Sequence, residues 1–194
     1  MRKWNYPGKA CLAPTRIMKF DSEIHHRRSI RMAGFNYRTA GGYFVTICSA
    51  QKRNVFGKVR CGVMELNPYG QMLDDCWRAL PEHFSYVVLD EYAIMPNHFH
   101  GILMFDTNVG ARHASPNMPD DNRHGELGTV VGSFKSALTK KINLYRVARN
   151  LPKATVWQRN YYECIIRDEN ELNEIRRYII ENPLNWATDE NYRP

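Results

Sequence analysis

Two histidines stand at the head of an apolar run near the middle of the chain, where residues 95–103 read MPNHFHGIL. In a β-strand, successive side chains alternate between the two faces of the sheet. His98 and His100 would then point the same way, and Phe99 would point into the core on the other face. The pattern predicts a strand that is buried on one face and carries two neighbouring imidazoles on the other.

Two imidazoles on one strand face can hold one divalent cation, provided that a third ligand arrives from elsewhere in the chain. The same pair also fits an ordinary solvated sheet face, and the pattern alone does not separate the two interpretations. A candidate third ligand, Asn182, and a candidate nucleophile, Tyr178, lie near the far end of the chain and favour the metal site.

Hydrophobic periodicity predicts the element order strand, helix, strand, strand, helix, strand, helix. The expected strands fall at 43–48, 86–95, 98–105 and 156–166, and the expected helices at 67–80, 127–150 and 168–182. The first six elements match the split β-α-β plan of ferredoxin-like domains, a four-stranded antiparallel sheet with helices on one face. We therefore expect an α+β fold of this type, followed by a C-terminal helix that carries the candidate nucleophile Tyr178.

The chain divides into a basic N-terminal extension at 1–38, one domain at 39–187 and a short tail at 188–194. Within the domain, residues 106–125 are rich in Asn, Pro, Gly, Asp and Arg, a composition typical of loops. A loop of this length in a small domain is usually functional or disordered, and we expect it to be flexible.

Positive charge is concentrated in two parts of the chain. The net charge is +7, and residues 1–38 alone hold nine Lys and Arg against two Asp and Glu. A second basic segment runs from Lys135 to Arg177. Basic segments with interspersed tyrosine and tryptophan suit a polyanion with bases to stack on, although a solvated basic surface is the simpler alternative. The candidate DNA contacts are Arg28, Arg31, Lys135, Lys140 and Lys141.

The sequence excludes several other classes of protein. No apolar run approaches the roughly 18 residues of a membrane span, and no apolar stretch follows the charged N-terminus as in a signal peptide. The five cysteines are scattered and form no Cys-x-x-Cys pair, so a cysteine-type zinc site is not expected. These features predict a cytoplasmic protein.

The last predicted helix has an apolar stripe with two polar residues at its margin. Leu172, Ile175 and Ile179 form the stripe, and Tyr178 and Asn182 lie four residues apart beside it. A tyrosine there can be half buried with its hydroxyl exposed, and the asparagine can offer a carbonyl oxygen to a metal. Alternatively, the tyrosine simply packs its ring, and the asparagine ends the helix before a proline.

This set of residues suits phosphodiester chemistry. A divalent cation neutralises the charge that repels nucleophiles from the phosphate, and a tyrosine phenolate can attack in line to form a phosphotyrosine bond. A mixed nitrogen and oxygen ligand set suits Mn²⁺ or Mg²⁺. Tyr161 and Tyr162 are rival nucleophiles, but they fall on a predicted strand and have no candidate ligand one helical turn away. Tyr145 is a weaker rival on the basic helix. Glu174 could orient a water or the metal.

Three segments together resemble the REP-associated tyrosine transposases, a group of bacterial single-tyrosine transposases with a His-hydrophobic-His motif. They are MPNHFHG at 95–101, VWQRNYYE at 156–163 and RYIIENPLNW at 177–186. The resemblance spans about 28–186. It implies a metal-dependent single-stranded DNA endonuclease and strand transferase that cleaves at hairpin-forming palindromic repeats. The implied metal ligands are His98, His100 and Asn182, and the implied nucleophile is Tyr178.

The resemblance also implies an association with the bacterial nucleoid and leaves two alternatives open. A domesticated relative could bind DNA hairpins without cutting them, as a regulator. An RNA-binding module of ferredoxin-like fold fits less well, because its aromatic-rich signature is missing. The sequence does not decide between a monomer and a homodimer, or between an active site within one chain and one shared by two.

Overall fold

The computed structural model of the 194-residue chain describes residues 41–105 and 126–193. The predicted N-terminal extension, with Arg28 and Arg31, and the predicted loop at 106–125 lie outside the described residues. In the part of the chain that is described, no helix has both the length and the apolar character needed to cross a membrane.

Four strands form one antiparallel sheet in the order β4-β5-β1-β6. Their bounds are β1 (Gly41–Cys48), β4 (Val87–Ile94), β5 (His98–Phe105) and β6 (Tyr162–Ile166). The two central strands, β1 and β5, are the ones separated by a helix and a strand in the chain, as the split β-α-β plan requires. The predicted α+β, ferredoxin-like fold is confirmed.

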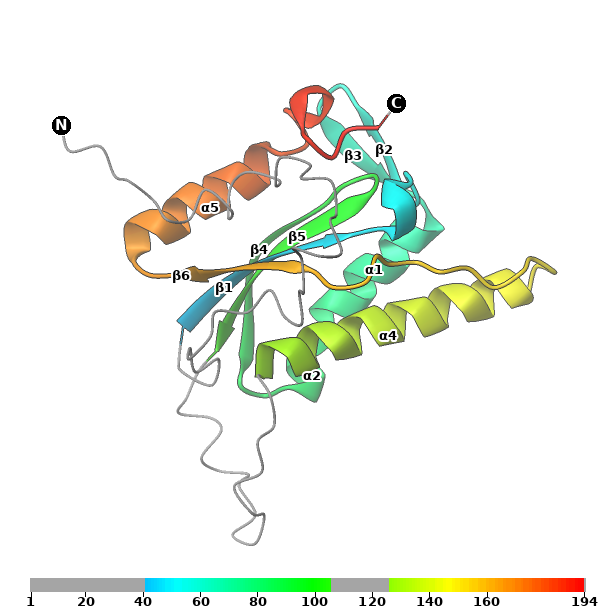
Figure 1. Cartoon of the computed structure of the whole chain (residues 1–194), viewed down its shortest axis with the longest axis horizontal. Helices are drawn as coiled ribbons and strands as arrows, with labels where there is room; N and C mark the ends of the chain where they lie inside the picture. Colours follow the sequence, from blue (N-terminus) through cyan, green and yellow to red (C-terminus); the bar gives the residue numbers. More distant parts are fainter. Residues whose placement is uncertain (1–40, 106–125, 194) are drawn as a thin grey trace, which may run out of the picture.

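Helices α1 (Pro68–Arg78) and α4 (Glu126–Val147) cover one face of this sheet (Figure 1). Asn67 starts α1 as predicted, because its side-chain oxygen accepts hydrogen bonds from the backbone N–H groups of Tyr69 and Gly70. The rings of Trp77 on α1 and Phe99 on β5 lie 4.5 Å apart at the centre of the main core. Phe99 therefore points into the core, as the alternation predicts.

Helix α5 (Glu169–Glu181) covers the opposite face (Figure 1). Asp168 caps its N-terminus by accepting from the backbone N–H of Glu171. The predicted apolar stripe is buried against the sheet in a second, smaller core, whose members are Phe44, Ile102, Cys164, Ile166, Leu172, Ile175 and Ile179. This second core holds the tyrosine helix against the face on which the histidines lie.

The remaining elements are short. They are η1 (Ala50–Lys52), the hairpin of β2 (Gly57–Arg60) and β3 (Val63–Leu66), α2 (Leu80–His83) and η2 (Trp186–Thr188). The predicted fourth strand at 156–166 was too long, because Trp157 forms only an isolated bridge with Ser49. Asn160 adopts a positive φ of 68°, which interrupts extended backbone, and β6 begins after it.

Candidate functional site

The two motif histidines occupy the first and third positions of β5 and share the face covered by α5. Both are buried, and their Nε2 atoms lie 2.9 Å apart. Across the sheet they pair with Cys48 and Thr46 of β1, respectively. The predicted side-by-side imidazoles are therefore present, in a buried rather than a solvated setting.

The outer ring nitrogens are held by hydrogen bonds. His98 Nδ1 lies 2.9 Å from Asn97 Oδ1, and His100 Nδ1 lies 2.8 Å from Thr46 Oγ1. The Asn97 amide nitrogen donates to the carbonyls of Lys52 and Asn191, which fixes its oxygen toward the imidazole. An amide oxygen only accepts, so His98 carries its proton on Nδ1 and presents a lone pair on Nε2.

Burial keeps both histidines neutral. It lowers the pKa of His98 to about 3, with a further contribution from the positive charge of Lys52. It also lowers the pKa of His100 well below its ordinary value, helped by the neighbouring His98. Neutral imidazole is the form that binds metal ions.

Tyr178 reaches this pair from α5 within the same chain. Its hydroxyl oxygen lies 3.4 Å from His100 Nε2, and its ring makes an edge contact with Phe44. The side chain is half buried, as the helix pattern indicates. Burial, with a contribution from the charge of Asp189, raises the pKa of Tyr178 to about 12. The phenol is therefore protonated at neutral pH.

Asn182 lies one turn beyond Tyr178 and is also buried. Its amide nitrogen donates to Asp189 Oδ2 at 3.2 Å. Its Oδ1 atom is buried and has no hydrogen-bond partner among the described residues. A buried oxygen without a donor costs free energy, and a cation would satisfy it. The structure thus brings His98, His100, Tyr178 and Asn182 together, while their roles as ligands and nucleophile stay predictions.

Asp189 also lies in this group, although the sequence did not predict it as a site residue. Ligand atoms of His98, His100 and Asp189 all lie within 4.8 Å of one another, so the group could hold a metal ion. The residue falls in the segment at 188–194 that the sequence suggested was a tail. A carboxylate shortly after the tyrosine helix was the only signal, and no periodicity showed where it would point.

A cavity of about 250 Å³ opens beside Tyr178. It gives access to the site from the side of α5 and the residues that follow this helix. The lining residues are Tyr178, Glu181, Asn182, Asn185, Thr188, Asp189 and Glu190. Three of them are acidic, so the cavity suits a cation better than an anion.

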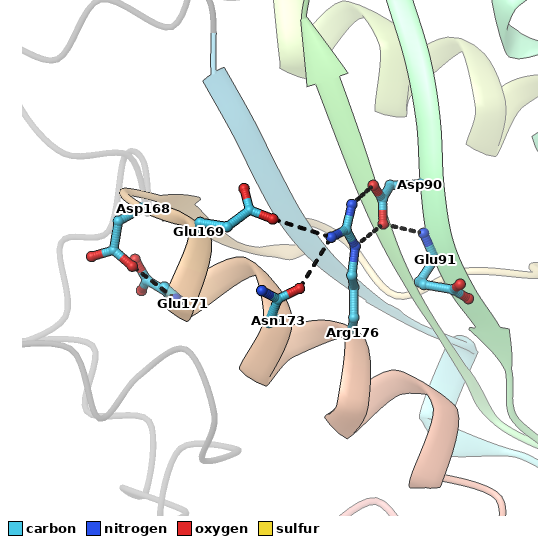
Figure 2. Close-up of polar contacts among 7 residues, drawn as sticks. All are labelled: Asp90, Glu91, Asp168, Glu169, Glu171, Asn173 and Arg176. Carbon is cyan, nitrogen blue, oxygen red and sulfur yellow. Dashed lines mark hydrogen bonds and ion pairs between the residues drawn. The ribbon is translucent and has the colours of Figure 1, made fainter.

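An ion pair fixes α5 on the sheet (Figure 2). Arg176 Nε and Nη2 lie 2.8 and 2.6 Å from the two carboxylate oxygens of Asp90 on β4. Asp90 lies where the pairing of β4 with β5 shifts register, between Leu89 and Tyr92. Hydrogen bonds from Arg176 lower the pKa of Asp90. The pair sets the position of α5 two residues before Tyr178.

The predicted DNA-contacting lysines lie elsewhere, on α4 across the sheet from the histidines. Lys135 donates to the backbone carbonyls of Gln158 and Asn160, at 2.8 Å each. Lys141 pairs with Asp75 at 2.7 Å, and Lys140 is exposed. The structure does not bring these lysines to the metal-ligand candidates.

The rival tyrosines differ in their relation to the histidines. Tyr145 lies on α4, across the sheet. Tyr162 pairs with Thr46 of β1, which in turn pairs with His100, so it occupies the histidine face with one strand between. Neighbouring strands are about 4.8 Å apart, which leaves Tyr162 farther from the histidines than Tyr178.

The chain has relatives among known proteins. No protein-family model matches the chain. An uncharacterized protein of Haemophilus influenzae is 39% identical over 180 residues, covering 90% of this chain and 97% of the relative. A second Haemophilus influenzae protein, provisionally named a REP-associated tyrosine transposase, is 25% identical over 154 residues, covering 77% of this chain and 76% of that protein.

A solved structure of a REP-associated tyrosine transposase bound to a REP hairpin has the same fold. Its TM-score is 0.52 at 16% identity, over 80% of this chain and 74% of that one. The likeness in fold and the sequence relationship agree with the motif at His98 and His100. The chain is thus similar to REP-associated tyrosine transposases, in fold to the solved structure and more distantly in sequence to the protein so named.

Proposed function

We propose that this protein is a metal-dependent single-stranded DNA endonuclease and strand transferase. It cleaves at hairpin-forming palindromic repeats through a covalent bond between Tyr178 and the DNA. One observation carries the proposal: the Tyr178 hydroxyl lies 3.4 Å from His100 Nε2, beside a second histidine and a buried amide oxygen. A nucleophile within reach of candidate metal ligands is the arrangement that such chemistry requires.

Three neutral groups are the proposed core of the metal site. His98 and His100 would supply nitrogen ligands, and Asn182 would supply the amide oxygen that lacks a hydrogen-bond donor. This mixed donor set suits Mn²⁺ or Mg²⁺, with Mn²⁺ favoured because Mg²⁺ prefers oxygen ligands. When bound, the cation would neutralise phosphate charge and polarise a phosphoryl oxygen.

Tyr178 would perform the covalent step. Its hydroxyl oxygen attacks phosphorus in line, so an oxygen–phosphorus bond to tyrosine forms and the bond to one strand end breaks. The departing oxygen takes up a proton and leaves as a free hydroxyl, which balances the proton lost by the phenol. The energy of the phosphodiester is kept in the new bond, so the strand can be rejoined elsewhere.

A raised pKa is compatible with this role. Burial holds the pKa of Tyr178 at about 12, so the resting side chain is a neutral phenol rather than a reactive phenolate. Positive charge in the site would favour the phenolate when substrate is present. The nucleophile would therefore be activated only in the assembled complex.

The proposed substrate rests on two supports. The related structure is described as bound to a REP hairpin. The net charge of +7 favours a polyanionic ligand. The predicted contacts through Arg28, Arg31, Lys135, Lys140 and Lys141 belong to this part of the proposal.

A denaturing gel of labelled repeat hairpins, with Mn²⁺ or with chelator, tests the function. We expect a protein–DNA adduct that requires metal and disappears in Tyr178→Phe. Tyr162→Phe is the matched control, because that tyrosine lies on the same sheet face and should leave the adduct intact. Tight hairpin binding without an adduct would instead support a silent DNA-binding regulator. An adduct retained in Tyr178→Phe would move the nucleophile to another tyrosine.

A further inference from the structure

The residues after the tyrosine helix pack against the histidines. We call Trp186–Arg193 the carboxyl segment. The ring of Trp186 lies 5.9 Å from the ring of His98. Asn191 is buried, its carbonyl accepts from Asn97 Nδ2 at 2.6 Å, and its side-chain oxygen accepts from Lys52 Nζ at 2.7 Å. The segment therefore has a defined place in the site.

These contacts aim Asp189 at the histidine pair. One carboxylate oxygen accepts from the backbone N–H of Asn191 at 2.6 Å, and the other accepts from Asn182 Nδ2 at 3.2 Å. A ligand oxygen of Asp189 lies within 4.8 Å of both imidazoles. Asn182 thus touches the carboxylate with its nitrogen, while its own buried oxygen has no donor among the described residues.

We propose that Asp189 is a ligand of the same divalent cation as His98, His100 and Asn182, so that cation binding and docking of the carboxyl segment are coupled. The inference rests on the proposed function in one respect, since both assume that the site binds a metal. Three neutral ligands would leave the full charge of the cation in a buried setting, whereas a carboxylate offsets part of it. A carboxylate is also a ligand that Mn²⁺ and Mg²⁺ favour.

Coupling follows from thermodynamic linkage. A cation that binds Asp189 only when the carboxyl segment is docked stabilises the docked state as its concentration rises above its dissociation constant. The reciprocal also holds, since contacts that dock the segment strengthen cation binding. Lys52 and Asn97 therefore act as positioning residues for Asp189, through their hydrogen bonds to Asn191.

The first experiment measures Mn²⁺ affinity of the full chain by the electron paramagnetic resonance signal of free Mn²⁺. We compare the unaltered chain with Asp189→Asn and Glu190→Gln. The Glu190 carboxylate lines the same cavity, so its loss is a charge-matched control. We expect Asp189→Asn to weaken binding at least roughly 10-fold and Glu190→Gln to change it less than about 3-fold. Equal effects of the two substitutions would overturn the proposal.

The second experiment separates a ligand from a nearby charge. Loss of a protein ligand opens a coordination position to water, so bound Mn²⁺ should relax water protons faster in Asp189→Asn. Hydrogen exchange of residues 186–193 should slow on adding Mn²⁺ to the unaltered chain and stay unchanged in Asp189→Asn. Unchanged proton relaxation, or slowed exchange in both proteins, would contradict the inference.

A third variant distinguishes this proposal from the proposed function. His100→Ala removes a ligand on which both depend and should abolish Mn²⁺ binding. If the unaltered chain binds no Mn²⁺, both proposals fail together. If it binds Mn²⁺, loses it in His100→Ala and keeps it in Asp189→Asn, only the role of Asp189 fails. Thermal melts by circular dichroism show whether each variant is folded.

Discussion

Arg176 of α5 and Asp90 of β4 form a two-point ion pair, with nitrogen–oxygen distances of 2.8 and 2.6 Å. The pair is partly shielded from water, since the side chains are 33% and 16% exposed. Glu169 and Asn173 add contacts from the same helix to the guanidinium (Figure 2). Tyr178 follows Arg176 by two residues, so this pair helps to align the candidate nucleophile with the histidines.

Replacing Arg176 with methionine should destabilise the fold and misplace the tyrosine helix. We expect a loss of about 1 kcal/mol in the free energy of unfolding, the upper end for exposed pairs, because this pair is two-pronged and partly buried. Urea denaturation measures the loss. The yield of protein–DNA adduct should fall even where the variant is fully folded.

Lys141→Met is the control for this prediction. Its partner Asp75 lies on α1, and the two side chains are 44% and 65% exposed. We expect a loss below about 0.5 kcal/mol and an unchanged adduct yield. If the two variants lose the same stability and the same adduct yield, Arg176 has no special role in positioning α5.

The contribution of Asp90 should depend on pH. Hydrogen bonds from Arg176 lower the pKa of Asp90 in the folded protein below its unfolded value of about 4. A lowered carboxyl pKa contributes stability that is fully present above the unfolded value and is lost as pH falls through the folded value. The stability difference between the unaltered chain and Asp90→Asn should therefore shrink as the pH falls below about 4.

Denaturation curves at several pH values test this dependence. In an Arg176→Met background the Asp90→Asn difference should shrink less with falling pH, because the largest cause of the lowered pKa is gone and only the hydrogen bond from the Glu91 backbone N–H still lowers it. A difference that grows on acidification would show that the carboxylate is destabilising in the folded state.

Gly101, the residue after the second histidine, should tolerate no larger side chain. A β-carbon there would lie 2.6 Å from the Trp77 ring and 2.8 Å from the Phe99 ring, both in the main core. We expect Gly101→Ala to cost about 1–3 kcal/mol of unfolding free energy by overpacking. The imidazoles lie on the other face of β5, so Mn²⁺ affinity of the folded fraction should change little.

Gly132→Ala is the opposite case and serves as the control. Gly132 lies on the exposed side of α4, and an added β-carbon would meet nothing within 4 Å. Alanine is the better helix former, so we expect a gain of about 0.5–1 kcal/mol. Thermal denaturation of both variants gives the comparison, and a destabilised Gly132→Ala would refute the helix argument.

The sequence predicted those parts of the fold that follow from the pattern of apolar residues along the chain. Apolar runs indicated the buried strands β1 and β5, and helical periodicity indicated the buried face of α5, because burial on one face of a helix imposes a period of 3.6. Local signals for Asn67 and Asp168 also predicted where two helices begin. Element order then limited the sheet to the split β-α-β plan.

The missed features depend on single residues and long-range contacts. Asn160 interrupts the fourth strand through its own backbone conformation, which periodicity does not record. Asp189 reaches the histidines only because Asn191 is buried against Asn97 and Lys52, far away in the sequence. The two-pronged contact of Arg176 with Asp90 is equally long-range, and no local pattern connects the two residues.

The three lysines on α4 should separate into a structural and a DNA-binding role. Lys135 is partly buried, and its ammonium donates to two backbone carbonyls of the segment before β6. We expect Lys135→Gln to cost about 1 kcal/mol of stability, because the partly buried carbonyl of Gln158 loses its donor, whereas the carbonyl of Asn160 is exposed to water. Urea denaturation measures this loss, and Lys140→Gln should leave stability unchanged because Lys140 is exposed.

Binding of hairpin DNA at several salt concentrations tests the DNA role of Lys140. Each phosphate neutralised by a lysine adds about 0.7–0.9 to the slope of log affinity against log salt. If α4 contacts the DNA backbone, Lys140→Gln should lower that slope by nearly this amount and weaken binding to all hairpins alike, since phosphate contacts carry no sequence information. An unchanged slope would leave the binding surface to other basic residues, with Arg28 and Arg31 as the next candidates to replace.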